Sequence, residues 1–363
     1  MRREHGRTVE VETLERFDAL AAQAARMDGW RIQGVDLRDR TELLRGLDPC
    51  GALLLGCSLT EAAERHVISG GGLVFPELPA LPFDAYRARL YTPEELYAGL
   101  EESYQSTPDA RSYVWSRRDT ADIAVTLARG LHDTAVDDAL TERLAGTATV
   151  GVMGGHALRR DEHGYADAAR LGRELARAGL YVATGGGPGA MEAANLGAYL
   201  SSTDDAALAH ALGLLAPAPA FTPSVGAWAA AAFAVRDRWP DGADSLGIPT
   251  WFYGHEPPNA FANDIAKYFQ NSLREDTLLR SCDAGIIFLP GAGGTVQEIF
   301  QDACENYYAE PSAMAQMVLV GVEHWTRTVP AWPLLAALAR DRAMADHIHL
   351  VDTVEEVVGL VSP

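Results

Sequence analysis

The sequence has few basic residues and almost no lysine. Its 363 residues include 50 acidic but only 30 basic ones, which gives a formal net charge of −20 at pH 7, and Lys267 is its single lysine. Nucleic acids bind to basic surfaces, so this balance argues against a nucleic-acid partner. No run of 18 apolar residues occurs, and the segment Met1–His5 has no apolar signal core. We therefore expect a cytoplasmic protein with no membrane partner.

Cysteine is scarce, and the motifs of several catalytic classes are missing. The cysteines form no CxxC pair, and we expect reduced, buried, small apolar residues at all four positions, Cys50, Cys57, Cys282 and Cys304. The absence of an HExxH motif or a paired Cys/His cluster predicts that there is no catalytic metal. The absence of GxxxxGK[ST] excludes a Walker-type ATPase. We expect no cofactor.

A glycine-rich turn at residues 289–295 is the most informative feature that is present. The apolar run before it, residues 284–288, is typical of a fully buried parallel strand, and a helical pattern follows it. A strand, a glycine turn and a helix N-terminus together form a phosphate-binding arrangement. Glu298 falls about one turn into this helix. Its carboxylate would repel a phosphate unless it faces the attached sugar; alternatively, Glu298 only favours the helix N-terminus.

A second unit of the same kind lies about a hundred residues earlier. Residues 180–184 are predicted to form a strand, and the sequence GGGPGAMEAAN follows at 185–195. Two such units predict one nucleotide-sized site at the carboxyl ends of a parallel sheet.

Together these residues resemble the Lonely Guy (LOG) family, whose members carry a GGGPGxMEAAN-type motif and a PGGxGTxxE motif. The first motif is matched without a gap. In the second, Ala292 stands where the family usually has its second glycine. A positive φ at this position would strain the alanine by about 1 kcal/mol. The resemblance covers residues 147–363.

The resemblance implies a Rossmann-like α/β fold, a doubly wound parallel sheet with helices on both faces. It also implies hydrolysis of the N-glycosidic bond of a nucleoside 5′-monophosphate, either AMP or a prenylated cytokinin form, to free base and ribose 5-phosphate. Glu298 would stabilise the ribosyl cation and orient water, and Arg274, with Arg280 as the fallback, would pair with Glu298 or contact the substrate. LOG relatives assemble, so we expect a homodimer or a larger homo-oligomer.

Glycines and one threonine are the predicted nucleotide-binding residues. The phosphate and nucleotide are expected at Gly291, Gly293, Gly294, Thr295, Gly185, Gly186, Gly187, Gly189, Gly154 and Gly155. Arg159 or Arg160 would pair with a phosphate or belong to a solvated helix start, and His156 would touch a base or be an ordinary loop histidine. His255 or Glu256 would contact the substrate or lie in an ordinary proline-rigidified turn. Glu192 is interpreted as a helix-start acid.

The chain is predicted to divide near residue 147. Residues 1–146 would form a small α/β unit of unknown role, with strands at 51–56 and 71–76 around a helix at 60–67. Its glycines indicate tight turns, with a second nucleotide site as the alternative. Residues 119–144 are predicted to be mostly helical, a connecting or dimer-packing helix with Gly130 as a break.

The second part would begin with a strand at 148–153, and a helix would end near residue 178. An alanine-rich helical insertion is predicted at about 201–247, and a strand at 248–253. The insertion would cap the site or form an oligomer contact.

Other functions remain open from the residues alone. Gly185, Gly187 and Ala190 satisfy the GxGxxA pattern of a dehydrogenase, but Asp204 and Asp205 open a helical stretch where a ribose-binding acid should end a strand. A lysine decarboxylase needs a Schiff-base lysine, and Lys267 lies in an apparently helical run. A non-catalytic nucleotide or molybdenum-cofactor binding or sensor protein, and a structural role of the first 146 residues, are the alternatives to the hydrolase.

Overall fold

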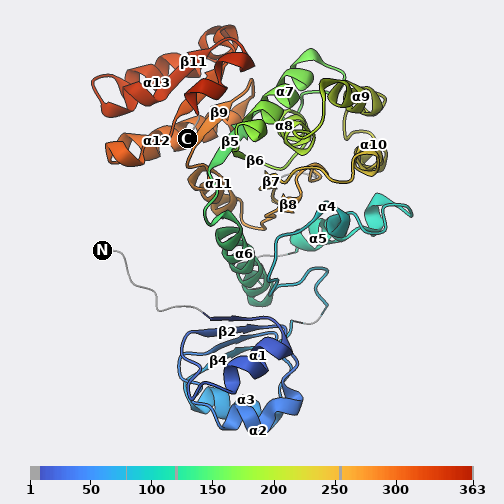
Figure 1. Cartoon of the computed structure of the whole chain (residues 1–363), viewed down its shortest axis with the longest axis vertical. Coiled ribbons are helices and arrows are strands. Elements are labelled where there is room, and N and C mark those ends of the chain that lie inside the picture. Colours follow the sequence, from blue (N-terminus) through green and yellow to red (C-terminus); the bar gives the residue numbers. More distant parts are fainter. Residues whose placement is uncertain (1–8, 79, 119–121, 253–255, 362–363) are drawn as a thin grey trace. The chain divides into compact units, whose positions relative to one another are not determined.

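The computed structural model describes residues 9–78, 80–118, 122–252 and 256–361 (Figure 1). The chain forms two compact units: the first contains residues 1–89 and 119–139, and the second contains residues 90–118 and 140–363. This division differs from the single boundary predicted near residue 147, because the chain enters the second unit, returns to the first and leaves it again. Helix α6 (Ile123–Leu144) makes the last crossing, and Gly130 does not break it.

The first unit is a four-stranded parallel sheet in sequential order. Its strands are β1 (Val9–Val11), β2 (Trp30–Gln33), β3 (Leu53–Leu55) and β4 (Leu73–Phe75), and its helices between strands are α1 (Leu14–Ala21), α2 (Thr41–Arg45) and α3 (Glu61–Ser69). The side chains of Thr13 and Thr60 cap α1 and α3 by accepting backbone N–H bonds. Each strand and helix forms a repeat of about twenty residues, which buries its apolar face against the next repeat.

The two strands and the helix predicted in this unit are present as β3, β4 and α3. The glycines near residues 51–56 and 70–72 lie in the turns around β3 and β4, as the tight-turn interpretation predicts. The repeats of β1 and β2 were not predicted. These strands, VEV and WRIQ, contain charged or polar residues, whereas the predicted strands β3 (LLL) and β4 (LVF) are continuous apolar runs.

The second unit is a seven-stranded parallel sheet in the order β11-β10-β9-β5-β6-β7-β8. Its strands are β5 (Thr149–Met153), β6 (Tyr181–Thr184), β7 (Leu246–Gly247), β8 (Asp264–Ile265), β9 (Gly285–Phe288), β10 (Met317–Val320) and β11 (Ile348–Val351). The chain starts in the middle at β5, proceeds outward to β8, and then returns to β9 on the other side of β5. This is the predicted Rossmann-like, doubly wound α/β fold.

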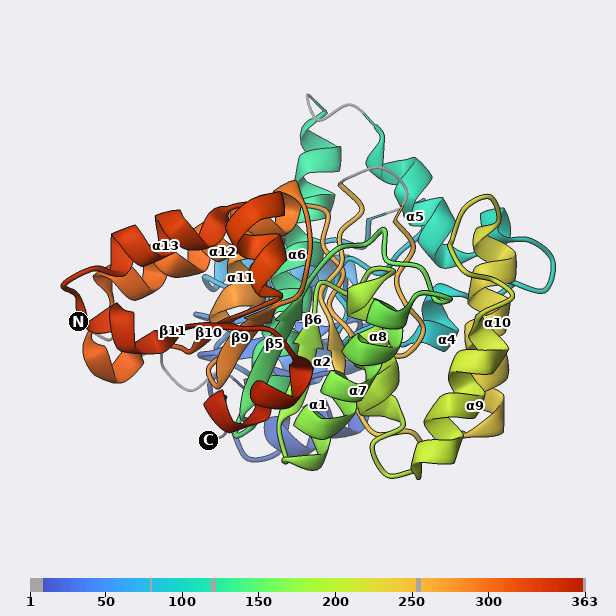
Figure 2. The same ribbon diagram turned by 90° about the horizontal axis from the view of Figure 1, so that it is seen from above.

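Helices cover both faces of this sheet (Figure 2). Helices α7 (His163–Arg177) and α8 (Ala190–Tyr199) pack on one face, and α11 (Asn271–Arg280), α12 (Gly293–Tyr308) and α13 (Ala331–Ala339) on the other. The central strands β5 and β9 are buried along their whole length. Strand β6, before the second glycine turn, is buried except at Tyr181, so the strands predicted before both glycine turns lie in the core.

The insertion is helical as predicted, with α9 (Asp205–Leu215) and α10 (Val225–Arg238) capped by Asp204 and Ser224. The strand predicted at 248–253 is wrong for residues 248–252, because β7 ends at Gly247; Tyr253 lies outside the described residues. Pro249, which has no N–H to donate to a sheet, follows directly.

Residues 90–118 belong to the second unit because a buried ion pair holds them there. Helix α4 (Pro93–Leu96) precedes α5 (Pro108–Ser116), and Asp109 on α5 accepts hydrogen bonds from Lys267 Nζ at 2.6 Å and from Trp251 Nε1 at 2.8 Å. Burial lowers the pKa of Lys267. The run around Lys267 is extended, starting in β8, rather than helical. The only lysine therefore holds two segments of the fold together.

All four cysteines are free thiols. Cys57 and Cys282 are buried as predicted, whereas the prediction is wrong for Cys50 and Cys304, which are exposed.

Candidate functional site

The sheet topology singles out the crevice between β5 and β9. The chain leaves these adjacent strands in opposite directions, and ligands of open α/β sheets bind at such a switch point, outside the carboxyl ends of the strands. Gly154 and Gly155 follow β5, and the first glycine turn follows β9. Gly155 N donates to Pro290 O at 3.1 Å. The structure therefore brings these two predicted segments together at the switch point.

The glycine turn after β9 leads into an open helix N-terminus. Helix α12 starts at Gly293, and among the described residues no side chain caps it. Gly293 and Gly294 are exposed and face open space, since no atom lies within 4 Å of the position that a Cβ would occupy. The first N–H groups of α12 are therefore available to an anion.

Ala292 adopts no positive φ in this turn. Its φ is −122° and its ψ −143°, so the position does not need the positive φ that would penalise alanine. The adjacent Gly291 has a different constraint. A Cβ there would lie 2.2 Å from Thr295 Oγ1, so the buried Thr295 side chain requires glycine at this position.

His324 is a neighbour of this turn that the sequence did not reveal. It begins the short π-helix η4 (His324–Thr328), and its Nε2 lies 2.9 Å from Gly291 O and 3.3 Å from Gly291 N. The contact joins segments 33 residues apart, and no motif surrounds His324.

Arg274 and Glu298 face each other, as the resemblance implied. Arg274 Nη1 lies 3.6 Å from Glu298 Oε1, and the two side chains are only 11% and 14% exposed. Arg274 is held by two carbonyls: its Nε donates to Ile248 O at 2.7 Å and its Nη2 to Gly185 O at 3.4 Å. The guanidinium therefore connects the loops after β6 and β7 to helix α12.

Burial raises the pKa of Glu298 to about 7, which Arg274 partly opposes and Glu275 increases. Near pH 7 this carboxyl is therefore present in both its protonated and its ionised form. A group of that kind can accept or donate a proton at neutral pH.

The second glycine turn is buried throughout residues 185–189. Gly186 and Gly189 have φ of +70° and +74°. A Cβ at Gly189 would lie 2.4 Å from Gly155 O. This turn packs against the loop after β5 and positions the Arg274 guanidinium.

Two asparagines that were not predicted as site residues hold this turn. Asn195 Oδ1 accepts hydrogen bonds from Thr184 Oγ1 at 2.7 Å and from Asn259 Nδ2 at 3.0 Å. Asn259 also donates its backbone N–H to Gly186 O at 2.8 Å. Asn195 ends the recognised motif and Asn259 follows two prolines, but only the folded chain places them together.

Several other candidates are engaged elsewhere. Arg160 is buried and paired with Glu192, so it is neither a phosphate contact nor a solvated helix-start residue; Glu192 is a helix-start acid as predicted, and it is buried. Arg159 pairs with Asp161, and Arg280 with Asp276, all four being exposed. Arg159 and Arg280 thus each form an ion pair at the surface.

The remaining loop candidates lie beside the second turn. His156 Nδ1 lies 3.4 Å from Glu256 Oε1. A Cβ at Gly187 would lie 3.6 Å from Glu256 Oε2, so this pair borders the turn. His255 lies outside the described residues.

Asp302 is a buried carboxyl one helical turn beyond Glu298. It is 4% exposed, and within the described part of the chain its Oδ2 has no hydrogen-bond partner. Burial, with a contribution from Glu305, raises its pKa to about 8. It is therefore mostly neutral at pH 7 and adds little negative charge beside Glu298.

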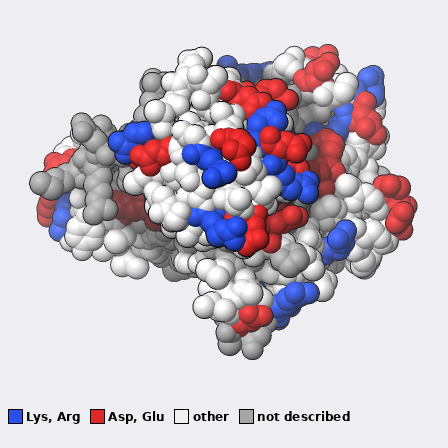
Figure 3. All heavy atoms as spheres, turned by 90° about the horizontal axis from the view of Figure 1, so that it is seen from below, with Lys and Arg blue, Asp and Glu red and all other residues white. Residues whose placement is uncertain are grey.

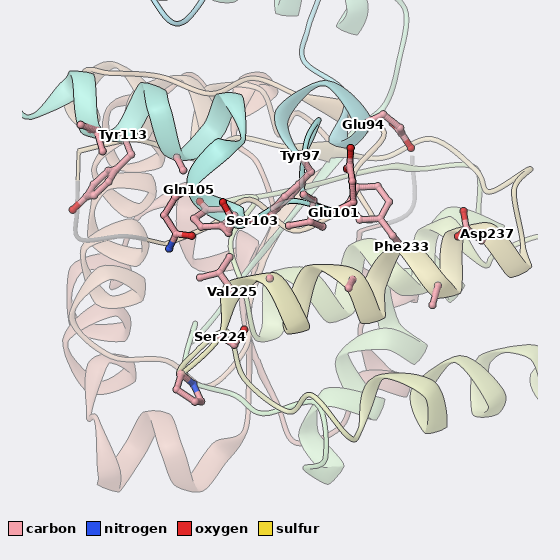
Figure 4. A pocket seen from close by; sticks show the side chains of 18 residues that line it. Glu94, Tyr97, Glu101, Ser103, Gln105, Tyr113, Ser224, Val225, Phe233 and Asp237 are labelled. Atoms are coloured by element: carbon pink, nitrogen blue, oxygen red, sulfur yellow. The ribbon is translucent and has the colours of Figure 1, made fainter.

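A large cavity lies away from the glycine turns. It has a volume of about 1070 Å³, lies between the α4–α5 segment and α10, and is lined by aromatic and acidic side chains including Tyr97, Phe233 and Glu94 (Figure 4). A second cavity, of about 270 Å³, borders Gly189 and residues of the insertion.

Among the residues that the structure describes, no group of three or more His, Cys, Asp or Glu side chains is arranged to hold a metal ion. In the same residues, no helix combines the length and apolarity needed to cross a membrane. The face drawn in Figure 3 shows acidic and basic side chains interspersed rather than one continuous basic patch.

Three solved structures show a distant similarity to part of the chain. The molybdenum cofactor binding protein from the phototrophic bacterium Rippkaea orientalis is 16% identical, with a TM-score of 0.38, over 59% of this chain and 95% of that chain. The Moco carrier protein from Chlamydomonas reinhardtii is 17% identical (TM-score 0.35; 59% and 95%), and the structural-genomics target TM1055 is 20% identical (TM-score 0.37; 59% and 98%). Likeness at this level assigns no activity to this chain.

No curated protein matches the chain. Residues 147–204, from β5 to the end of the loop after α8, match the SLOG cluster4 family model. This segment contains the GGGPGAMEAAN motif, whereas the turn after β9 lies outside it. The predicted resemblance to LOG-type proteins is thus confirmed for residues 147–204.

Proposed function

We propose that this protein hydrolyses the N-glycosidic bond of a nucleoside 5′-monophosphate, such as AMP or a cytokinin ribotide, to free base and ribose 5-phosphate. The observation that carries the proposal is the largely buried Arg274–Glu298 pair, whose glutamate lies on α12, the helix that begins at the switch point of the sheet without a side-chain cap from the described residues.

The 5′-phosphate would bind at the start of α12. Backbone N–H groups of Gly291, Gly293, Gly294 and Thr295 are the donors, and the positive end of the helix dipole favours the dianion. The open space at Gly293 and Gly294 supports this placement. Gly154 and Gly155 would form the opposite wall, and the buried turn at residues 185–189 would support it.

Glu298 would act on the sugar attached to that phosphate. As the C1′–N bond breaks, its electron pair leaves with the base and positive charge develops on the ribosyl group. An ionised Glu298 stabilises this charge and accepts a proton from the water that attacks C1′, and the departing base takes up a proton. Arg274 favours the ionised form of Glu298 by opposing the effect of its burial.

Binding without turnover, by a nucleotide or molybdenum-cofactor binding or sensor protein, is the second candidate. The burial of Glu298 favours it, because a carboxyl with a pKa near 7 is neutral in about half of the molecules at neutral pH. A neutral carboxyl does not stabilise a ribosyl cation.

Incubation of the full chain with a panel of nucleoside monophosphates tests the proposal, with free base measured by chromatography and binding by calorimetry. Base release by the wild type, lost in Glu298→Gln while AMP still binds, would support the hydrolase. Binding of AMP with no release would overturn it in favour of the second candidate. If no tested nucleotide binds and none is hydrolysed, both the hydrolase and the non-catalytic binding protein are overturned for these ligands.

A further inference from the structure

The cavity of about 270 Å³ is built by three separate segments of the second unit. One wall is the loop after β5, at His156–Leu158. A second is the end of the glycine turn, Pro188 and Gly189, with Glu192 below it. The third belongs to the insertion, residues 219–222 together with Trp228.

This cavity adjoins the proposed catalytic pair along the second glycine turn. Gly185, the first residue of the turn, contacts Arg274, and Gly189, the last, lines the cavity. Four residues span at most about 14 Å even when extended, and a turn spans less. The catalytic pair and the cavity therefore lie at the two ends of one short turn, and Gly189 also lies against Gly155, which donates to Pro290 O in the turn before α12.

The insertion gives the cavity aromatic walls. The rings of Phe221 and Trp228 are 6.5 Å apart at an interplanar angle of 72°, and Trp228 is 1% exposed. His156, 56% exposed at its side chain, contributes a third ring on the opposite segment. Planar aromatic faces of this kind bind the flat ring of a base by stacking or edge contacts.

Arg160 fixes these walls in place. Its Nη1 donates to Ala218 O at 3.1 Å and to Trp228 O at 3.0 Å, and its backbone N–H to Pro219 O at 3.0 Å. Its guanidinium also lies 4.7 Å from the centroid of the Trp228 ring. The insertion is therefore attached to the loop after β5, and the cavity exists before any ligand binds.

The same arginine neutralises the floor of the cavity. Arg160 Nε donates to Glu192 Oε2 at 3.0 Å, and both side chains are 1% exposed. The buried carboxylate is thus matched by a buried cation. A floor without net charge suits a neutral heterocycle better than a second phosphate.

We propose that this cavity is the base subsite of the enzyme and that it binds the purine ring of the substrate; this inference rests on the proposed function. At about 30 Å³ per water molecule, the cavity has room for about nine waters. The purine ring system with one exocyclic amine has ten non-hydrogen atoms, so it matches the cavity in size. The insertion thereby sets which nucleotide is bound.

The test fills the cavity from the insertion side and compares AMP with ribose 5-phosphate, which has no base. Binding is measured by calorimetry in the Glu298→Gln background, so that AMP is not consumed. Ala220→Trp places an indole in the cavity. Ala209→Trp, at an exposed position of α9 that does not line the cavity, is the matched control. Circular dichroism checks that each variant is folded, and Phe221→Ala is a second variant that removes a wall without adding bulk.

We expect Glu298→Gln protein to bind AMP at least tenfold more tightly than ribose 5-phosphate. Ala220→Trp should weaken AMP binding at least tenfold and change ribose 5-phosphate binding less than twofold, and Ala209→Trp should change neither. Equal affinity for AMP and ribose 5-phosphate would overturn the base subsite and leave the phosphate site at the start of α12 standing. The same follows if neither Ala220→Trp nor Phe221→Ala changes AMP binding. Failure of Glu298→Gln protein to bind either ligand would overturn the proposed function itself.

Discussion

The buried carboxyl of Asp302 makes stability depend on pH in a direction that can be measured. The pKa of an aspartate is ordinarily 3.8, and burial in the folded protein raises that of Asp302 to about 8. Between these values the folded state holds a proton that the unfolded chain has lost. The free energy of unfolding therefore falls as pH rises from about 4 to about 8, and this contribution changes no further above pH 8.

The size of the effect follows from the shift. Each pKa unit corresponds to about 1.4 kcal/mol, so the contribution changes by up to about 3 kcal/mol between pH 5.5 and 7.5. Asp302→Asn removes the titrating group and keeps its shape. Its amide, buried without a partner, costs a constant amount at every pH, whereas the wild type loses stability as pH rises. The variant should therefore gain stability relative to the wild type over these two pH units.

Urea unfolding followed by tryptophan fluorescence measures this difference. Every tryptophan except Trp30 lies in the second unit, so the signal reports the unit that contains Asp302. Glu298 also titrates in this range, but it is present in both proteins and cancels. Asp161→Asn, at an exposed aspartate whose pKa is lowered by Arg159, is the control and should show no trend between pH 5.5 and 7.5. The compared quantity is the free energy of unfolding of the wild type minus that of Asp302→Asn. If this difference stays constant within about 0.5 kcal/mol between pH 5.5 and 7.5, the carboxyl at this position is not buried without a partner.

Four further predictions concern the site and the assembly. Glu298→Gln should lower base release at least 10²-fold while AMP affinity stays nearly unchanged, and turnover retained within about tenfold would contradict its catalytic role. Adenosine should bind at least two orders of magnitude more weakly than AMP in a competition assay that also includes NAD, since several backbone N–H bonds to a dianion are lost; equal binding would mean that the turn after β9 is only structural. Arg160→Met should lower the free energy of unfolding by about 3–5 kcal/mol, because it leaves Glu192 buried without its cation, and urea unfolding with a loss under 1 kcal/mol would show that Glu192 finds another partner. The protein should be a homodimer or larger by light scattering at micromolar concentration, and a mass near 39.0 kDa alone would exclude this.

The parts of the fold that the sequence predicted are those with strong local signals. Strands β5, β6 and β9 are buried apolar runs that end in glycines, and α9 and α10 are long alanine-rich helices with polar caps. Strands β7 and β8, with two residues each, have no detectable period, and they owe their position to pairing with β6 rather than to their own sequence.

The site was predictable in the same uneven way. The pairing of Arg274 with Glu298 came from the resemblance, which supplied a distance along the chain that no local pattern contains. His324 and Asn259 reach the site through contacts between segments 33 and 64 residues apart. The prediction of a phosphate contact for Arg160 failed because burial, and the carbonyls of an insertion 58 residues away, decide where this guanidinium points.

Two buried ion pairs connect the Rossmann-like sheet unit to the segments added around it. Asp109–Lys267 joins residues 90–118 to the segment after β8, and Arg160, paired with Glu192, donates to the carbonyls of Ala218 and Trp228 in the insertion. Burying such a pair costs desolvation energy that the attraction between the charges barely offsets, so neither pair is an efficient way to add stability. Removing one partner, however, leaves an uncompensated charge, so any arrangement that separates the partners is strongly disfavoured. The Asp109–Lys267 pair therefore fixes where residues 90–118 dock, and the Arg160–Glu192 pair fixes the guanidinium whose hydrogen bonds hold the insertion, which the proposed base subsite requires.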